Sequence, residues 1–484
     1  MSAEELQHYL SDDSRRGSAP PGAFDGAAGG APCGDLVRIS VAIADGRIGA
    51  VKFDAEGCAA ARAAAAATAE LVEDQPVLAV ARIGPEAISR ALGGLSAQGR
   101  HAAELASDAL HRALSAAASS GARLAVAPHD GERTLVAVSG GVDSTVAALL
   151  ERERGADVVA VTVKLWADEQ NDGERSCCSP QAVLSARGIS HSLGIPHLTL
   201  DLRDEFRIGV VDEFLGGHAA GRTPNPCVLC NGEVRIDAMV ALAERVGASH
   251  LATGHYARLA DDGDGPLLAA PADSAKDQTY MLSGIRARTL SRLRFPLADL
   301  CKPEVRRLAA DAGLPVARKP ESQDLCFLAG EGKRGFLGRH GGLGARVGDV
   351  VDSRGRVLGE HEGHHNFTVG QRRGIGVGAP EPLYVLATEA ESNRIVVGPR
   401  EELATTRVRV RDARLHREGR RVDRVKLRYR SKPIECRLEG ELNGPGSYQE
   451  LTVALAEPAY GVAPGQTACL MDGDLVLGRG TIAA

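Results

Sequence analysis

The sequence has 484 residues, of which 44% are hydrophobic, 25% charged and only 3% aromatic, and this composition predicts about three globular domains with cores of Leu, Val, Ile and Ala. The formal net charge of −6 excludes a uniformly basic nucleic-acid binder, so any contact with RNA would need a local basic patch. No stretch is long and apolar enough to span a bilayer, and residues 1–17 are polar and partly acidic, which predicts a cytoplasmic protein with no membrane partner and no signal or transit peptide. Ten cysteines in such a protein favour metal binding or sulfur chemistry over a disulfide framework.

The first predicted domain covers residues 1–122 and contains an alanine run at 59–67 that favours a helix. A resemblance to a known family is carried by residues 30–41, 51–73 and 92–114. These segments resemble the iron–sulfur scaffolds of the NifU/IscU type, which implies an α+β fold for this region.

The resemblance places four residues at positions that bind a cluster or zinc in that family: Cys33, Asp35, Cys58 and His101. Ala102 stands where the family has a third cysteine. The absence of that cysteine would weaken cluster assembly. Two thiols, a carboxylate and an imidazole could still bind iron or zinc, or one cysteine could accept a persulfide. The alternative is a degenerate domain that is kept for an interaction.

The second predicted domain, residues 132–330, follows a break at 119–132 and alternates strand-like with helix-like segments. Apolar runs predict strands at 134–138, 158–163, 198–200 and 250–253. Helical patterns occupy 145–154, 179–193 with Ser179 as its N-cap, and the segment after Asn231. Repeated strand–helix units imply a parallel sheet with helices on both faces, in which ligands bind beyond the carboxyl ends of the strands.

A glycine-rich loop follows the first of these strands and consists of Ser139, Gly140, Gly141, Val142, Asp143 and Ser144. Two glycines let the backbone approach phosphates closely, and the next helix offers free N–H groups at its N-terminus. Asp143 could hold Mg²⁺, which would bridge phosphate oxygens. The loop lacks the lysine of a Walker A sequence. It resembles the pyrophosphatase loop of enzymes that cleave ATP between the α- and β-phosphates and transfer AMP; the alternative is a plain turn.

Three cysteines of this domain suggest the chemistry that follows adenylation. Cys227 and Cys230 lie in front of a helical pattern, a position and spacing that should lower a thiol pKa and favour the thiolate. Cys326 lies near the end of the domain. A CxxC pair could also be half of a zinc site, which needs two further ligands that the adjacent Cys177 and Cys178 are poorly spaced to supply. Buried inert thiols are a further alternative.

The third and fourth predicted domains, residues 331–402 and 403–484, follow breaks near 330–344 and 397–406. Short alternating runs in the last domain predict a small antiparallel β-barrel or sandwich. Between residues 407 and 437 there are thirteen Arg or Lys against four Asp or Glu, which suits contact with phosphates. The alternative is a merely solvated basic face.

From about residue 133 onward the chain is similar to the tRNA-specific 2-thiouridylases of the MnmA type. The motifs that carry this resemblance occupy residues 221–231, 253–258, 276–282, 302–327 and 359–378. The resemblance implies an α/β fold with an adenine-nucleotide α-hydrolase-like (PP-loop) parallel sheet, a central tRNA-contacting domain and a C-terminal β-barrel. It also implies ATP and Mg²⁺ as cofactors, the anticodon stem-loop of tRNA as substrate, and a persulfide donor such as a cysteine desulfurase or a sulfur-relay protein.

Carried over residue by residue, the resemblance implies three groups of site residues. The ATP site would comprise residues 139–144 together with Ala137, Val138, Val163 and Gly254. The tRNA would be contacted by Asn225, Pro226, Cys227, His255, Lys276, Asp277, Gln278, Arg428, Tyr429 and Gln466. Cys230 would be the nucleophile and Cys326 the persulfide carrier.

This assignment makes chemical sense for a wobble uridine. Its C2 oxygen is a poor leaving group, and adenylation would convert it into AMP, a good one. A persulfide on Cys326, or sulfide released when Cys230 attacks it, would then displace AMP, provided that the two thiols lie within disulfide reach. Cys227 replaces an Asp found in many family members, so Cys227, Cys230 and Cys326 could instead hold a [4Fe–4S] cluster with one iron left open for sulfide.

Two interpretations of other kinds remain open. The chain could adenylate a small metabolite, although the CxxC pair and the basic barrel speak against it. It could also be an iron–sulfur scaffold or carrier without enzymatic activity, against which the intact loop at 139–144 argues. The fusion of a scaffold to a thiolase suggests delivery of sulfur or a cluster within one chain, through a raised effective concentration.

Overall fold

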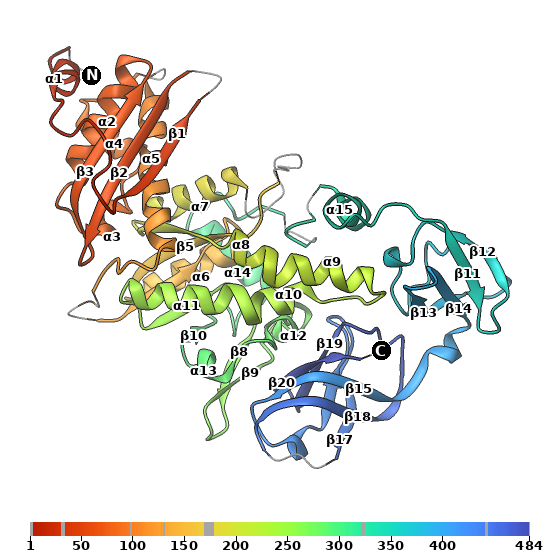
Figure 1. The fold of residues 1–484 in the computed structure, drawn as a ribbon. Helices are drawn as coiled ribbons and strands as arrows, with labels where there is room; N and C mark the ends of the chain where they lie inside the picture. The colour runs from red at the N-terminus through yellow and green to blue at the C-terminus, as the bar shows by residue number, and fades with distance from the viewer. Residues whose placement is uncertain are drawn as a thin grey trace.

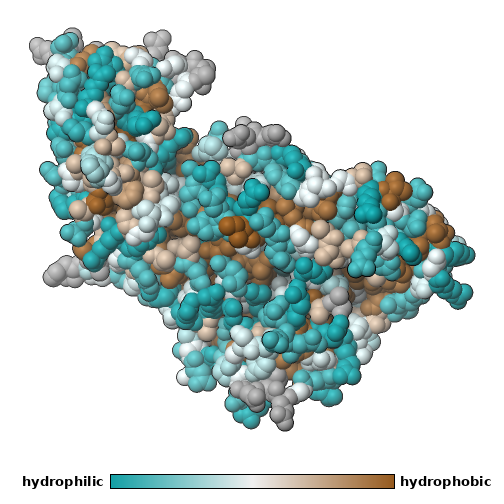
Figure 2. All heavy atoms as spheres, viewed as in Figure 1, coloured by the Kyte–Doolittle hydropathy of each residue, from teal (hydrophilic) through white to brown (hydrophobic). Residues whose placement is uncertain are grey.

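The computed structural model describes residues 3–30, 34–96, 99–126, 128, 131–168, 179–320, 325–328, 330–440 and 444–483, so the predicted ligand Cys33 lies outside the described residues. Figure 1 shows an N-terminal domain, a central α/β domain and two β-rich domains at the other end of the molecule. On the face shown in Figure 2, hydrophilic residues cover most of the surface and hydrophobic residues form small separate groups. Among the described residues, no helix combines the length and apolar character that crossing a membrane requires.

The N-terminal domain is an α+β fold, as predicted. Its antiparallel sheet has the order β1 (Phe24–Gly29), β2 (Leu36–Ala44) and β3 (Arg47–Glu56). Its helices are α1 (Ala3–Ser11), α2 (Ala59–Val72), α3 (Val77–Val80), α4 (Pro85–Ala91) and α5 (Arg100–Ser119). The alanine run forms the buried part of α2, where small side chains let the helix pack closely against the sheet.

The central domain contains the predicted parallel sheet. Its strand order is β10 (Leu293–Arg294), β7 (His250–Thr253), β4 (Arg133–Ala137), β5 (Asp157–Lys164) and β6 (His197–Asp201), all parallel. The main helices are α6 (Val142–Glu153), α7 (Pro180–Ser192), α11 (Ile236–Arg245) and α14 (Lys302–Asp311). Ser179 is the N-cap of α7, because its side chain accepts a hydrogen bond from the Ala182 N–H at 3.2 Å.

Shorter elements connect these units at the carboxyl end of the sheet. After β6 come α8 (Arg203–Phe206), the π-helix η1 (Arg207–Val211), α9 (Asp212–Ala219), α10 (Pro226–Leu229) and the π-helix η2 (Cys230–Arg235). After β7 come β8 (Arg258–Asp261), β9 (Pro266–Ala269), η3 (Ser274–Lys276), α12 (Thr279–Leu282) and α13 (Ala287–Leu290). Elements α10, η2 and α11 follow one another without a break, so residues 226–245 run as one helical rod.

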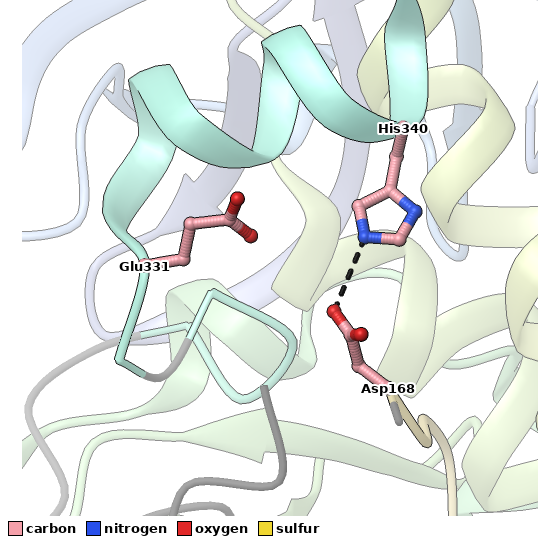
Figure 3. A group of neighbouring side chains, drawn as sticks. All are labelled: Asp168, Glu331 and His340. Atoms are coloured by element: carbon pink, nitrogen blue, oxygen red, sulfur yellow. Dashed lines mark hydrogen bonds and ion pairs between the residues drawn. The ribbon is translucent and has the colours of Figure 1, made fainter. Parts of the chain in front are cut away.

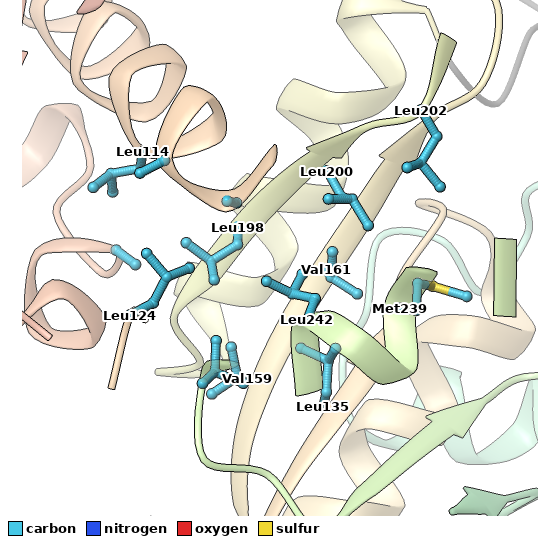
Figure 4. Close-up of a cluster of buried hydrophobic side chains, with 14 of the residues drawn as sticks. Leu114, Leu124, Leu135, Val159, Val161, Leu198, Leu200, Leu202, Met239 and Leu242 are labelled. Atoms are coloured by element: carbon cyan, nitrogen blue, oxygen red, sulfur yellow. The ribbon is translucent and has the colours of Figure 1, made fainter. Parts of the chain in front are cut away.

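One hydrophobic core joins the N-terminal domain to the central sheet. Figure 4 shows Leu114 of α5 and Leu124 beside Leu198 of β6, with Leu135 and Val159 from the neighbouring strands. Each of these side chains is almost completely buried, and burying one leucine contributes about 1.5–3 kcal/mol. The N-terminal domain is therefore packed against the edge of the sheet rather than tethered to it.

Polar contacts fix the same interface. The Arg187 guanidinium of α7 pairs with Asp108 of α5 at 3.3 Å. The Leu124 N–H donates to the Arg245 carbonyl at 2.9 Å, and the His197 N–H donates to the Ala81 carbonyl at 3.0 Å. These bonds place the N-terminal domain in a defined orientation on the central domain.

The two β-rich domains follow. The first contains α15 (Gly332–Gly341), η4 (His364–Asn366) and a sheet of order β12 (Val357–His361), β11 (Gly348–Asp352), β14 (Arg394–Gly398) and β13 (Tyr384–Glu389). The second contains η5 (Arg400–Leu403), β15 (Ala404–Leu415), η6 (Gly419–Arg421), β16 (Arg424–Lys426), β17 (Ile434–Glu439), β18 (Gly446–Tyr460), β19 (Thr467–Asp472) and β20 (Leu475–Ile482).

The C-terminal sheet closes on itself, which confirms the predicted small β-barrel. Six strands run in the order β15, β18, β17, β16, β19 and β20, and β20 pairs again with β15. Strand β20 also pairs with β9 of the central domain. The barrel is therefore held to the central domain by a shared sheet edge, close to the elements that carry the cysteines.

Candidate nucleotide and thiol site

The glycine-rich loop joins the end of β4 to the start of α6. Gly140 has a φ of +68°, a left-handed conformation that favours glycine. Gly141 is the N-cap of α6 and makes no side-chain capping hydrogen bond, while the Ser144 hydroxyl accepts a bond from the Ser139 N–H at 3.1 Å. The first N–H groups of α6 thus have no capping side chain, an arrangement that suits phosphate binding.

The loop opens into a pocket at the carboxyl ends of β4, β5 and β7. Most of the residues predicted to bind ATP line it: Ala137, Val138, Ser139, Asp143, Ser144, Val163 and Gly254. Gly140, Gly141 and Val142 belong to the loop but not to this lining. The remaining lining residues are Val161, Thr162, Leu165, Arg235, Met239, Thr253, His255 and Gln278. His255 and Gln278, expected to contact tRNA, therefore stand beside the expected nucleotide.

Gly254 permits the close approach of β7 to the loop. A Cβ atom at this position would lie 2.6 Å from the backbone N of Ser144. We expect Gly254→Ala to displace the first turn of α6 and to weaken ATP binding by at least about tenfold, because the N–H groups of that turn are the expected phosphate donors. Calorimetric titration of the full chain measures this affinity. Gly216→Ala, where a Cβ meets open space, is the control; equal affinities of the two variants would contradict the geometry.

Two of the three candidate thiols lie in the first turns of the helical rod 226–245. The Asn225 side chain caps its N-terminus by accepting a hydrogen bond from the Val228 N–H at 3.3 Å. Cys227 and Cys230 are one turn apart and therefore share a face of the helix. Cys230 is buried and Cys227 half-buried, and both are free thiols. The prediction placed these thiols before the helix, whereas the structure places them inside it.

The expected fall in thiol pKa is wrong for Cys227. Burial raises the pKa of the Cys227 thiol above its ordinary value, and the positive charge of Arg235 offsets only part of that rise. The helix N-terminus favours a thiolate, but burial penalises any charge and is the larger effect here. Cys227 is therefore protonated at neutral pH.

We expect the alkylation of Cys227 by iodoacetamide to be slow at neutral pH and to increase with pH, with a midpoint above the pKa of an unfolded thiol. The reason is that only the thiolate reacts and burial disfavours it. Peptide mass spectrometry after timed alkylation measures the rate at each pH. The same peptide in denaturant provides the reference midpoint, and a folded midpoint at or below it would contradict the burial effect.

Arg235 connects the thiol helix with the nucleotide pocket. It ends η2, the π-helix that begins at Cys230, and it lines the pocket. Its guanidinium lies 3.1 Å from Nε2 of His255, and its charge acts on the Cys227 thiol. Arg235 therefore lies between the nucleotide pocket and the helix that carries Cys227 and Cys230. Arg235 was not among the residues predicted from the sequence, although its place in the helical pattern just after the cysteine pair was an available signal.

Cys326 is packed near the same helices. Its neighbour Phe327 contacts Phe206 and Phe214, with ring centroids 5.7 and 5.2 Å apart. Phe206 belongs to α8, which contacts η2, the π-helix that begins at Cys230, and Cys326 is a half-buried free thiol. The sulfurs of Cys227, Cys230 and Cys326 do not form a set in which all lie within 4.8 Å of one another. Cys326 thus lies beside α8 and α9, of which α8 contacts the helix that carries Cys230, and the three thiols are not joined.

The residues expected to contact tRNA also serve as contacts between domains. In the barrel, the Gln466 side chain donates to the Thr223 carbonyl at 2.7 Å, and Lys426 pairs with Asp277 at 3.0 Å. Arg428 donates to the Val369 carbonyl at 2.8 Å. The ring of Tyr429 lies 6.3 Å from that of Tyr280. These contacts hold the barrel beside Asn225, Pro226 and Cys227, and near Lys276.

His255 is uncharged at neutral pH. Burial, with the nearby Arg235 charge as a second cause, lowers the pKa of His255 to about 3. Its Nδ1 lies 2.8 Å from the Thr253 hydroxyl. Both ring nitrogens have partners, since the Arg235 guanidinium can only donate to Nε2 and the Nδ1–H then donates to the Thr253 hydroxyl. The neutral imidazole therefore positions Arg235 at the pocket wall and adds no charge for phosphate.

Three of the four predicted metal ligands of the N-terminal domain can be placed. The Asp35 carboxylate accepts hydrogen bonds from the Cys58 N–H at 2.8 Å and from its Sγ at 3.2 Å. His101 lies in the first turn of α5 with a half-exposed side chain. Asp35, Cys58 and His101 do not form a set of ligand atoms within 4.8 Å of one another. The structure thus brings Asp35 and Cys58 together, and the metal site stays a prediction.

One group of metal-ligand side chains does meet that spacing: Asp168, Glu331 and His340 (Figure 3). His340 of α15 lies 3.2 Å from the Asp168 carboxylate. However, the Arg339 guanidinium pairs with both carboxylates, at 2.8 Å from Asp168 Oδ1 and 3.0 Å from Glu331 Oε1. The Arg339 guanidinium supplies the positive charge that a metal ion would otherwise provide. We therefore interpret this group as a polar contact that holds the segment after β5 against α15.

Part of the basic segment 407–437 joins the barrel to the central domain. Arg417 and Arg421 both pair with Asp262, in the turn between β8 and β9, at 2.7 and 2.6 Å, and Arg414 lies 3.9 Å from Glu233. The basic side chains that face solvent are Arg407, Arg409, Arg420, Arg424, Arg430, Lys432 and Arg437. The exposed basic face is therefore smaller than the residue count in the sequence indicates.

Known families match successive parts of the chain. Residues 4–120 match the family described as NifU-like N terminal domain, and residues 132–330 match tRNA methyl transferase HUP domain. Residues 334–399 match tRNA methyl transferase PRC-barrel domain, and residues 400–482 match Aminomethyltransferase beta-barrel domain. Together with the parallel sheet, its phosphate-type loop and the closed barrel, these matches define the class: a nucleotide-binding HUP protein that carries β-rich domains and a scaffold-like N-terminal domain.

A solved structure described as a putative iron-sulfur cluster assembly scaffold protein from Fervidobacterium islandicum is 20% identical and covers 20% of this chain and 73% of its own; its TM-score of 0.17 is too low to carry an argument. Two relatives that match in sequence narrow the class. The tRNA-specific 2-thiouridylase MnmA of Acidithiobacillus ferrooxidans is 44% identical, over 72% of this chain and 98% of its own. The bifunctional protein NifU/MnmA of Rubrobacter xylanophilus is 47% identical, over 95% of this chain and 93% of its own. The chain belongs to this NifU/MnmA family.

Proposed function

We propose that the chain is an ATP-dependent tRNA-uridine 2-sulfurtransferase that converts the wobble uridine of tRNA to 2-thiouridine in the cytoplasm. The observation that carries this proposal is the position of Arg235, which lines the nucleotide pocket and lies in the same helical rod, 226–245, as Cys227 and Cys230. Relatives that cover most of the chain are named tRNA-specific 2-thiouridylase, which supports tRNA as the substrate.

The first chemical step activates the base. The uridine O2 attacks the α-phosphorus of ATP, the bond from this phosphorus to the β-phosphate oxygen breaks, and pyrophosphate leaves with the electron pair. The N–H groups of the first turn of α6 and the loop hydroxyls orient the phosphates. The Asp143 carboxylate, at the pocket wall, is a suitable oxygen ligand for Mg²⁺, which would neutralise phosphate charge.

The second step transfers sulfur. A donor such as a cysteine desulfurase or a sulfur-relay protein loads Cys326 with a persulfide, whose terminal sulfur attacks C2 while AMP leaves. The Cys230 thiolate then attacks Sγ of Cys326, so that the bond to the transferred sulfur breaks and a Cys230–Cys326 disulfide forms. The base keeps the sulfur as 2-thiouridine. An external thiol reduces the disulfide and restores the free thiols.

The RNA must present an unstacked uridine to this region. Unstacking costs a few kcal/mol and is easiest in the single-stranded anticodon loop. The exposed basic residues of the barrel, Arg430 and Lys432 among them, suit the phosphates on either side. The barrel contacts Thr223 through Gln466, and Tyr429, the neighbour of Arg430, interacts electrostatically with Cys227, which supports this path for the RNA.

A test of this proposal measures pyrophosphate release and 2-thiouridine together. Full-length protein is incubated with ATP, Mg²⁺, unmodified tRNA and a persulfide donor, a cysteine desulfurase with cysteine, and the nucleosides are analysed by mass spectrometry. We expect pyrophosphate release that depends on tRNA and a thiolated wobble uridine. Release with a small metabolite in place of tRNA would instead identify a metabolite adenylase. No release under any condition would favour a scaffold or carrier.

A cluster-bound sulfide is the second candidate for the sulfur source. Cys227 and Cys230 share one face of a helix, and Cys326 lies on a separate segment beside α8 and α9. Three thiolates could hold a [4Fe–4S] cluster through different irons. The raised pKa of Cys227 favours the persulfide route, in which Cys227 is a bystander. Anaerobic purification with absorption spectroscopy and iron and sulfide analysis separates the two, since Cys227→Ala would lose iron only if a cluster is bound there.

We further propose that the N-terminal domain supplies sulfur or iron through Cys58 and Asp35, with His101 and Cys33 as further ligands. The docked arrangement places this end of the domain far from the thiols. Strand β3 rises about 30 Å from the turn at Gly46, which abuts Ala125, to its end beside Cys58. Along the helical rod, Cys230 lies about 22 Å from Arg245, whose carbonyl accepts the Leu124 N–H.

Strand β3 and the helical rod 226–245 both start at the interface between the two domains and run in different directions, as Figure 1 shows for the N-terminal strands and for α10 and α11. Direct transfer from Cys58 to Cys230 of the same chain therefore requires the interface to open. Transfer to a second molecule requires no such opening. The geometry favours delivery between molecules over the delivery within one chain that the fusion suggests.

We expect a mixture of Cys58→Ala and Cys230→Ser chains to form 2-thiouridine when cysteine and a desulfurase are the sulfur source, although neither variant does so alone. The first variant keeps the thiolation thiols, and the second keeps the N-terminal site. Nucleoside mass spectrometry measures the product. An inactive mixture would show that transfer stays within one chain, and an active Cys58→Ala chain would show that the N-terminal site is not needed.

A further inference from the structure

Two lysines reach the phosphate loop from another part of the chain. Nζ of Lys302 lies 2.7 Å from both carboxylate oxygens of Asp143. Nζ of Lys319 donates to the Gly140 carbonyl at 2.9 Å. The loop itself has no lysine of the Walker A kind, so these two ammonium groups are cations that this site gains only through folding.

Lys302 occupies a position that the stability of the fold does not explain. It is the first residue of α14, directly after the N-cap Cys301, where the helix dipole disfavours a positive charge. The residue is only 8% exposed, and burying an ammonium group is costly unless a partner compensates it. Asp143 provides that partner. A buried cation beside a phosphate-type loop points to a ligand with negative charge.

The packing of α14 fixes both lysines relative to the loop. Val305 and Ala309 of α14 share one buried cluster with Val142 and Val146 of α6. Val316, three residues before Lys319, belongs to the same cluster. The Lys319 side chain itself is exposed, so its ammonium group stays accessible while its backbone is anchored. Both cations therefore stand at the N-terminal end of α6, where phosphate would bind.

We propose that Lys302 and Lys319 bind the β- and γ-phosphates of ATP and stabilise pyrophosphate as it leaves. The inference rests on the proposed function and adds the positive charge that its first step needs. When the bond between the α-phosphorus and the β-phosphate oxygen breaks, the electron pair stays on pyrophosphate, and two ammonium groups offset the added charge. Asp143 would exchange Lys302 for Mg²⁺ on nucleotide binding, which frees Nζ for phosphate.

The experiment compares nucleotides that differ in their phosphates. Full-length protein with Mg²⁺ is titrated calorimetrically with AMP and with α,β-methylene-ATP, whose bridge cannot be cleaved. We expect Lys302→Met and Lys319→Met each to weaken binding of the ATP analogue by about tenfold or more, because a charge-assisted contact to phosphate is lost. AMP binding should be unchanged, since AMP has no β- or γ-phosphate.

Matched controls are Arg307→Met on α14 and Arg318→Met beside Lys319, both exposed cations, which should leave the affinity for the analogue unchanged. Lys302→Arg keeps the charge and should retain most of the affinity for the analogue. This variant, together with Lys319→Met, still tests the assignment if the Lys302→Met chain does not fold. Equal analogue affinity in the unaltered and both lysine variants would overturn the assignment, as would an equal loss for AMP. An unaltered chain that binds no analogue would overturn the proposed function itself.

Discussion

Replacing Cys230 or Cys326 by serine in the full-length chain is expected to abolish 2-thiouridine formation while pyrophosphate release with tRNA continues. Serine keeps the size of the side chain but can neither carry a persulfide nor attack an S–S bond. The loss of a covalent nucleophile commonly costs a factor of about a thousand or more in rate. Nucleoside mass spectrometry and a pyrophosphate assay on the same reaction measure both steps.

Other cysteines of the chain provide the controls. Cys436 is a half-buried free thiol of the barrel, and Cys436→Ser should leave both steps unchanged. Cys227→Ser should retain thiolation if Cys326 passes a persulfide, and should lose it if the three thiols hold a cluster. Thiolation that persists in Cys326→Ser would remove this residue from the mechanism. Loss of pyrophosphate release in the same variant would mean that the pocket itself had been damaged.

The parallel sheet could be predicted because its signals are local. Each strand is a short apolar run followed by a helical pattern, and the predicted strand at 250–253 is β7 as the structure has it. The helix predicted at 145–154 begins earlier, at Val142, because the glycine-rich loop itself enters the first turn. That difference matters for function, since it places Asp143 and Ser144 on the helix whose N–H groups face the pocket.

The contacts between distant segments could not be predicted from local patterns. Lys302 meets Asp143 across 159 residues of sequence, and β20 pairs with β9 of another domain. Arg235 looked like any charged residue of a helix, until folding placed it in the pocket wall. The direction of the Cys227 thiol pKa could not be predicted either, because the sequence indicates the helix N-terminus but not the depth of burial.

Asp108→Ala is expected to lower the free energy of unfolding by about 3–5 kcal/mol, because it leaves a buried guanidinium without its partner. Arg187 of α7 pairs with Asp108 of α5 at 3.3 Å, with side chains that are 8% and 21% exposed. Burial lowers the pKa of Arg187, and the Asp108 charge offsets part of that effect. Urea unfolding followed by circular dichroism measures the loss, together with hydrogen exchange in α5, which should become faster.

The second ion pair of the same carboxylate provides the control. Arg112 contacts Asp108 at 2.8 Å but its side chain is 53% exposed, so Arg112→Ala should cost less than about 1 kcal/mol. Arg187→Met in addition to Asp108→Ala should recover much of the stability, because the unpaired charge is then gone. Equal small losses for Asp108→Ala and Arg112→Ala would contradict a firmly docked domain. They would also remove the geometric reason for transfer between molecules, since a loosely held N-terminal domain could bring Cys58 to Cys230 of its own chain.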